Sequence, residues 1–175
     1  MNDVFPEICG AAVGEAPAGS IAIIPHHDGP LLTLIADESV QKDLRSIVIL
    51  NLNHPGHPSV VFHENWGMRD SCLYYKSSLR FELSNKVDDI STNATWWRVS
   101  GIIASFQNEF FIRAAAASRG GFRYVNVQTG AVFAGDTPNF YAVFGVWSIW
   151  VRDPFRERST QLFEFDIHNQ GSKQA

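Results

Sequence analysis

Five of the six histidines in this chain fall between residues 26 and 63, and imidazole is the side chain best suited to chemistry near neutral pH. The cluster consists of His26, His27, His54, His57 and His63. Imidazole is a common ligand of divalent metals, and a three-histidine site leaves one coordination position open for water or substrate. The candidate ligands therefore lie in two short segments, 25–30 and 53–58, and in the residues just after them.

Both segments have the composition of tight turns. Residues 25–30 read PHHDGP and residues 53–58 read NHPGHP, so each contains two prolines and a glycine. If the two turns lie at the same end of the domain, four histidines can converge on a divalent metal such as zinc, iron or manganese. These are His54, His57, His63 and His26.

Adjacent side chains limit the metal set. In extended backbone they point to opposite sides, so at most one of His26 and His27 is expected to be a ligand. Glu64 or Asp28 would be the acid–base group of such a site. Histidines in proline- and glycine-containing turns are also ordinary solvated surface residues, and this alternative stays open.

Trp66 is expected in a turn formed by residues 64–67, beside the histidine region. A tryptophan offers a flat apolar face and a polar edge, on which a sugar ring or a small molecule can stack. We therefore predict a ligand-binding set made of Trp66, His54, His57 and His63. Aromatic residues usually fill a core, so Trp147 or Trp150, and one of Trp96 and Trp97, are expected inside.

The elements that must position these residues are strands. Short apolar runs recur about every ten residues between turn signals, which is typical of an all-β sandwich or barrel. We predict an antiparallel β-sandwich or flattened barrel of about ten strands, in a single domain over residues 20–170. Residues 1–19 are rich in Ala, Gly and Pro without a hydrophobic period, and are expected to form a flexible N-terminal arm.

Three segments carry more specific predictions. Residues 71–83 alternate between apolar and polar positions, which predicts one long strand with Leu73 facing the core and Cys72 partly exposed. Residues 105–120 have both helix punctuation and strand alternation; a strand is favoured and a helix stays open. Residues 139–151 are apolar on both faces, so this strand must be covered twice.

Composition limits the kinds of partner that this protein is expected to bind. A net charge of −4 with a pI near 5.8 argues against binding to nucleic acid. No stretch approaches the length of a membrane span and no export signal is visible, so we expect a cytoplasmic protein with free thiols. Charged residues make up only 18% of the chain, and a surface so poor in charge favours a homo-oligomer.

The leading functional hypothesis is a β-domain that binds a small molecule or a glycan and acts as an oligomer. One alternative is a metal-dependent enzyme that uses the histidine cluster on a β-barrel. Another is a structural protein of an oligomeric assembly. No nucleophile elbow, phosphate-binding loop or dinucleotide fingerprint occurs in the chain, so the sequence leaves open whether it is an enzyme.

Overall fold

The computed structural model confirms a single, nearly all-β domain. It describes residues 8–37, 43–52, 60–75, 79–86, 89–91, 96, 99–118, 120–133, 141–152 and 159–169. Within these ranges the chain forms fourteen short strands, more than the expected ten, and no α-helix. The strands are β1 (Ile8–Ala12), β2 (Ile21–Ile24), β3 (Leu31–Ile35), β4 (Leu44–Ile49), β5 (Val61–Gly67), β6 (Ser71–Tyr75), β7 (Leu79–Leu83), β8 (Ile90–Ser91), β9 (Ile103–Phe106), β10 (Glu109–Ala116), β11 (Phe122–Asn126), β12 (Ala142–Phe144), β13 (Val146–Arg152) and β14 (Ser159–Asp166), followed by the 3-10 turn η3 (Ile167–Asn169).

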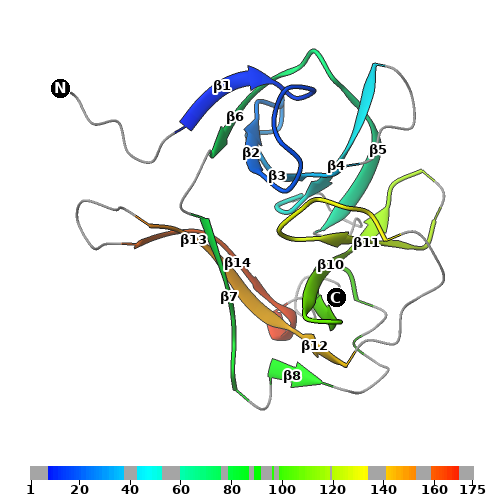
Figure 1. Ribbon diagram of the computed structural model, residues 1–175, viewed down its shortest axis with the longest axis vertical. Helices are drawn as coiled ribbons and strands as arrows, with labels where there is room; N and C mark the ends of the chain where they lie inside the picture. Colours follow the sequence, from blue (N-terminus) through cyan, green and yellow to red (C-terminus); the bar gives the residue numbers. More distant parts are fainter. Residues whose placement is uncertain are drawn as a thin grey trace.

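The strands form two sheets (Figure 1). The larger sheet has eleven strands in the order β1-β6-β2-β3-β4-β5-β10-β9-β12-β8, with β11 paired to β10. The smaller sheet has the order β14-β13-β7. Neighbouring strands are antiparallel except for β5 and β10, which run parallel and pair Val61 with Ala115.

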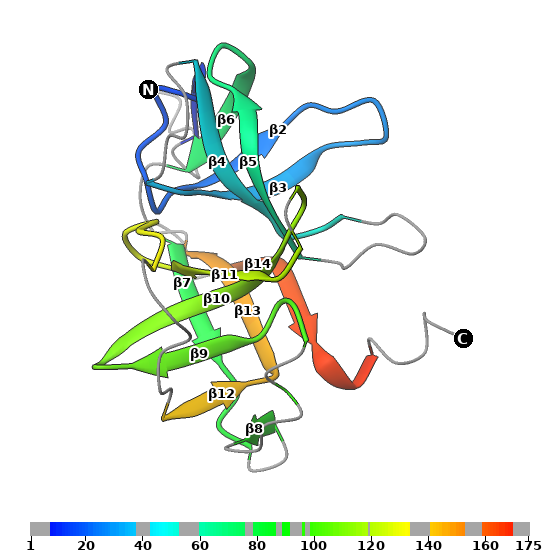
Figure 2. The same cartoon turned by 90° about the vertical axis from the view of Figure 1, so that its right-hand side faces the viewer.

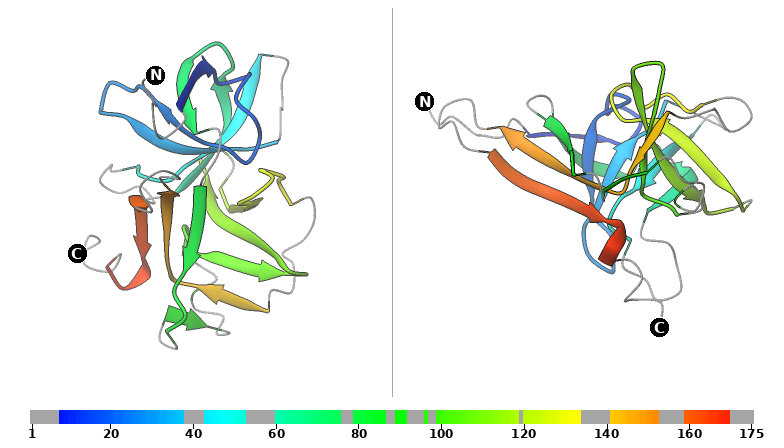
Figure 3. Two further views of the ribbon diagram at one scale, coloured as in Figure 1. Left: turned by 60° about the vertical axis from the view of Figure 1, so that its left-hand side comes forward. Right: turned by 90° about the horizontal axis from the view of Figure 1, so that it is seen from below.

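Two cores lie against the larger sheet. Strands β1 to β6 curl around one apolar cluster, while β9, β10 and β12 continue the same sheet towards the other end of the molecule (Figures 1 and 2). The smaller sheet lies against this second part (Figure 3). The main core contains side chains from both sheets, and its largest fully buried members are Trp147, Phe62 and Phe165. The expected burial of Trp147 is therefore confirmed. The larger sheet does not close into a barrel.

Hairpins account for several of the expected strands. The runs before and after the first histidine turn form β2 and β3, which pair Ile21 with Leu34. The segment 105–120 is a strand rather than a helix. Gln107 and Asn108 both have positive φ, 50° and 65°, which is the geometry of a two-residue hairpin turn between β9 and β10.

The expectation of a flexible N-terminal arm is wrong for residues 8–19. Ile8–Ala12 forms β1, which pairs along its length with β6, and the next turn buries Val13 and Ala16 almost completely. The small side chains that suggested a loose arm instead allow this segment to lie close to the sheet. Residues 1–7 lie outside the described residues.

The expected single strand over residues 71–83 is two strands in different sheets. The half that forms β6 pairs with β1 and β2, whereas the half that forms β7 pairs with β13. Alternation holds within β7, but Cys72 is buried at 3% exposure and Leu73 is 47% exposed, the reverse of the prediction. The two halves have different neighbours, so one alternation cannot describe both.

The segment predicted as one strand over residues 139–151 is also divided between the two sheets, which explains why it is apolar on both faces. The chain passes from β12 in the larger sheet to β13 in the smaller one at Gly145. A Cβ atom on Gly145 would lie 2.5 Å from Ile167 and 2.7 Å from Trp96. Only glycine leaves room for this passage between the sheets. No helix in the described part of the chain has the length and apolar character needed to cross a membrane.

Candidate functional site

The structure places three of the predicted site residues in contact. The ring of Trp66 meets the ring of His63 edge-on at a centroid distance of 5.4 Å, and the ring of His26 lies 6.4 Å from it on another side. We call Trp66, His63 and His26 the ring cluster. Trp66 and His63 come from β5, and His26 comes from the turn between β2 and β3. Residues far apart in sequence are therefore brought together on the curled part of the larger sheet.

A β-bulge puts Trp66 and His63 on the same side of β5. In a regular strand, residues three positions apart point to opposite faces. Here Arg45 pairs with Trp66 and Ile47 pairs with His63, so β5 has one more residue than β4 between these pairs. Trp66 is accordingly a strand residue, because β5 continues to Gly67 and replaces the expected turn.

The turn between β2 and β3 gathers its own side chains. The Gly29 amide donates to the carbonyl of His26 at 3.1 Å, which closes the turn. The rings of His26 and His27 lie 4.0 Å apart, and His27 Nε2 lies 3.0 Å from a carboxylate oxygen of Asp28. The expectation that His26 and His27 point apart is wrong, because the backbone here turns instead of extending.

Hydrogen bonds indicate which nitrogen of each imidazole carries the proton. The Asn65 amide donates to Nδ1 of His63, and the Asp28 amide donates to Nδ1 of His26, each at 3.4 Å. These contacts favour the proton on Nε2 of both rings. Trp66 Nε1 is buried and has no hydrogen-bond partner among the described residues. The ring cluster thus combines three aromatic rings with the Nε2–H donors of its two imidazoles, whereas the indole N–H of Trp66 is buried.

Burial lowers the pKa of His63 below its ordinary value of 6.5, and the nearby charge of Glu64 opposes this shift only in part. As the pH falls below the ordinary value, the unfolded chain takes up a proton at this position before the folded chain does. We therefore expect the free energy of unfolding to fall as the pH drops from about 7 to about 5, and His63→Gln to weaken that dependence.

Urea unfolding at several pH values measures this slope for both proteins. In a parallel NMR titration, the imidazole signal of His63 should titrate at lower pH in the folded protein than in the urea-unfolded chain. Equal titration in the two states would contradict the expectation.

His54 and His57, the other two predicted site residues, lie outside the described residues. The chain just before them is placed, because Asn51 donates from Nδ2 to the carbonyl of Pro30 at 3.1 Å and accepts from the Leu32 amide at 2.7 Å. Asn51 is therefore fixed beside the first histidine turn.

Glu64 does not join the ring cluster. Its side chain is 7% exposed; one carboxylate oxygen lies 3.3 Å from Arg123 Nη2, and the other accepts from the Ser118 hydroxyl at 2.9 Å. Arg123 lies on β11, and Ser118 follows β10, the strand that pairs with β5. The carboxylate of Glu64 therefore links β5 to this part of the larger sheet. Of the two expected acid–base groups, Asp28 directs its carboxylate to a histidine nitrogen, whereas the carboxylate of Glu64 is directed to Arg123 and Ser118.

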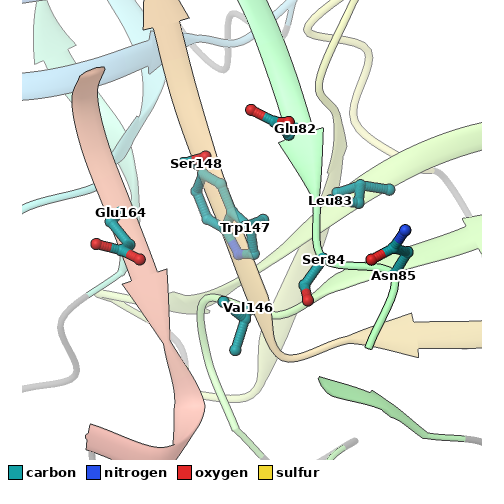
Figure 4. A pocket seen from close by; sticks show the side chains of 8 residues that line it. All are labelled: Glu82, Leu83, Ser84, Asn85, Val146, Trp147, Ser148 and Glu164. Carbon is teal, nitrogen blue, oxygen red and sulfur yellow. The ribbon is translucent and has the colours of Figure 1, made fainter. Parts of the chain in front are cut away.

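A separate groove crosses the smaller sheet (Figure 4). Glu82, Ser148 and Glu164 face it from the three neighbouring strands β7, β13 and β14. Its volume is about 240 Å³, below the roughly 300–1,000 Å³ of typical ligand pockets. The sequence predicts no groove here, although alternation along β7 and β14 marks both glutamates as exposed. Its small size and acidic lining make it a weaker candidate than the ring cluster.

The fold and the site define an all-β domain of two sheets with an aromatic and imidazole cluster on its curled half. No protein family, curated protein or solved structure gives a significant match to this chain.

Proposed function

We propose that this domain binds a small molecule or a glycan, with the ring cluster of Trp66, His63 and His26 as its recognition surface. The observation that carries the proposal is a half-buried tryptophan that contacts two imidazoles from separate elements. A flat apolar ring bordered by N–H donors is suited to a sugar ring or a planar molecule, which offers apolar faces and oxygen acceptors at its edge.

The charge state of His63 supports an uncharged ligand. The lowered pKa of His63 keeps its ring neutral near pH 7, so the cluster favours an uncharged ligand over an anionic one.

We also propose that the domain acts as a cytoplasmic homo-oligomer. Ile8 and Leu73 are large apolar side chains that stay 37% and 47% exposed on the paired strands β1 and β6. In the described part of the chain β1 is an edge strand, which can pair with another chain. Light scattering on the purified protein gives its mass in solution, and a monomer at all concentrations would contradict the oligomeric part of the proposal.

We expect Trp66→Ala to weaken recognition strongly. The wild-type protein is screened on an immobilised glycan array and against a small-molecule library, with tryptophan fluorescence as the second readout. For the strongest hit, Trp66→Ala should weaken binding at least about tenfold, which corresponds to roughly 1.4 kcal/mol. His63→Phe, which keeps a ring but removes the N–H donor, separates stacking from hydrogen bonding.

Trp150→Phe is the matched control, because Trp150 lies on the smaller sheet and donates its own Nε1–H to the Ser148 hydroxyl at 2.6 Å. It should leave affinity unchanged. The proposal fails if the hit binds equally well to Trp66→Ala, or if Trp150→Phe removes binding and Trp66→Ala does not.

A further inference from the structure

The turn between β2 and β3 gathers three metal-binding side chains, two of which lie outside the predicted metal set. One ligand atom from each of His26, His27 and Asp28 lies within 4.8 Å of those of the other two. Asp28 Oδ2 is 3.0 Å from His27 Nε2 and 3.7 Å from His26 Nδ1. The carboxylate oxygen therefore lies close to a nitrogen of each imidazole.

These separations match a coordination sphere. A tetrahedral ion with metal–ligand distances of about 2.0–2.1 Å keeps its ligand atoms about 3.3 Å apart. The separations of 3.0 and 3.7 Å fall on either side of that value, and all three ligand atoms lie within 4.8 Å of one another, so side-chain rotations can close the site. His26 Nδ1 would give up only its long contact with the Asp28 amide, at 3.4 Å.

The backbone of the turn holds these groups in place before an ion arrives. Pro25 and Pro30 flank the turn, and Gly29 has a φ of 114°, a conformation that L side chains rarely adopt. His26 is held further by its contact with Trp66, and only 29% of its side chain is exposed. Preorganisation of this kind reduces the entropy lost when the ligands are fixed around a metal.

We infer that this turn binds one divalent transition metal ion through His26, His27 and Asp28, with water completing the coordination. Two imidazoles and one carboxylate suit Zn²⁺, Ni²⁺ or Cu²⁺, whereas Mg²⁺ and Ca²⁺ prefer a shell of oxygen atoms. This metal site shares His26 with the ring cluster, but metal binding is tested with the ion alone, so its outcome is distinguishable from that of the proposed ligand binding.

Titration of the metal-free full chain with Ni²⁺ or Zn²⁺ in a calorimeter tests the site. One ion should bind per chain, and His27→Ala and Asp28→Asn should each weaken binding at least tenfold. Both residues are exposed, so these variants should fold, and their circular dichroism and melting temperature check this. His168→Ala is the matched control, since His168 also lies beside a carboxylate, that of Asp89 at 3.1 Å, and it should leave affinity unchanged.

Trp66 supplies a second readout. Cu²⁺ quenches nearby indole fluorescence, and the ring of Trp66 lies 6.4 Å from that of His26. Stoichiometric Cu²⁺ should therefore quench the wild-type protein, whereas Trp66→Phe should bind Cu²⁺ equally well and lose most of the quenching.

Two results would overturn the inference. One is unchanged affinity in the double variant His27→Ala with Asp28→Asn. The other is a pair of outcomes: replacing His54 and His57 removes metal binding, while the double variant at His27 and Asp28 retains it. The ion would then be held by the second histidine turn. Loss of glycan binding without loss of metal binding would count only against the proposed function.

Discussion

Gly101→Ala should destabilise the protein by about 3 to 5 kcal/mol, because alanine there meets both an unfavourable backbone and a filled core. Gly101 has a φ of 95°, and a Cβ atom built on it lies 2.2 Å from Cε2 of Phe165. Phe165 is 1% exposed and stacks on Trp147 at a centroid distance of 5.8 Å. A ring packed in this way can move only by displacing its neighbours.

The backbone of Gly101 also carries a link between the sheets. Its carbonyl accepts from Nε1 of Trp147 at 2.6 Å, and its amide donates to the carbonyl of Arg113 at 2.6 Å. Any shift that relieves the new clash disturbs these hydrogen bonds. The effect should appear as a melting temperature lower by about 6 to 20 °C, at about 2 to 4 °C per kcal/mol for a chain of this size.

Gly120→Ala is a matched control for the backbone cost. Gly120 also has a positive φ, 67°, but nothing lies within 4 Å of the position its Cβ would occupy. This variant should lose only about 1 kcal/mol. Equal losses in the two variants, measured by urea unfolding, would show that the contact with Phe165 does not limit the packing between the sheets.

Arg45→Met should destabilise the curled half of the larger sheet by about 2 to 4 kcal/mol, because the guanidinium satisfies several backbone carbonyls at once. Its Nη1 lies 2.7 Å from the carbonyl of Ala16, 3.0 Å from that of Gly14 and 3.4 Å from that of Val13. Its Nε donates to the carbonyl of Ala36 at 3.2 Å. Methionine keeps the apolar stem and removes all four contacts.

Partial burial lowers the pKa of Arg45 from its usual value, but the guanidinium remains charged at neutral pH. Hydrogen–deuterium exchange should accelerate over residues 13–20 in Arg45→Met, because this segment loses its main anchor to β4. The control is Arg80→Met. The Arg80 side chain is 64% exposed and its ion pair with Glu82 spans 3.2 Å, so the loss should stay below about 1 kcal/mol.

An equal loss of stability in Arg45→Met and Arg80→Met would contradict this role for Arg45. So would a large loss without faster exchange over residues 13–20, since it would place the effect elsewhere in the fold.

The sequence by itself determined the class of the domain and several of its elements. Turn chemistry predicted the tight turn between β2 and β3, and alternation predicted the strand β10, because side-chain period and glycine or proline turns are local properties. Residue type alone singled out Trp66, His63 and His26 as candidate site residues, and the structure brings these three rings together.

Tertiary structure decided the features that depend on which strands pair with one another. Which sheet each half of residues 71–83 joins, and therefore the burial of Cys72, depends on pairing with β1, β2 and β13. The common face of His63 and Trp66 depends on one extra residue in β5 opposite β4. The convergence of His26 and His27 depends on the fold of their turn. Side-chain direction is set by pairing partners and by bulges, and a single sequence records neither.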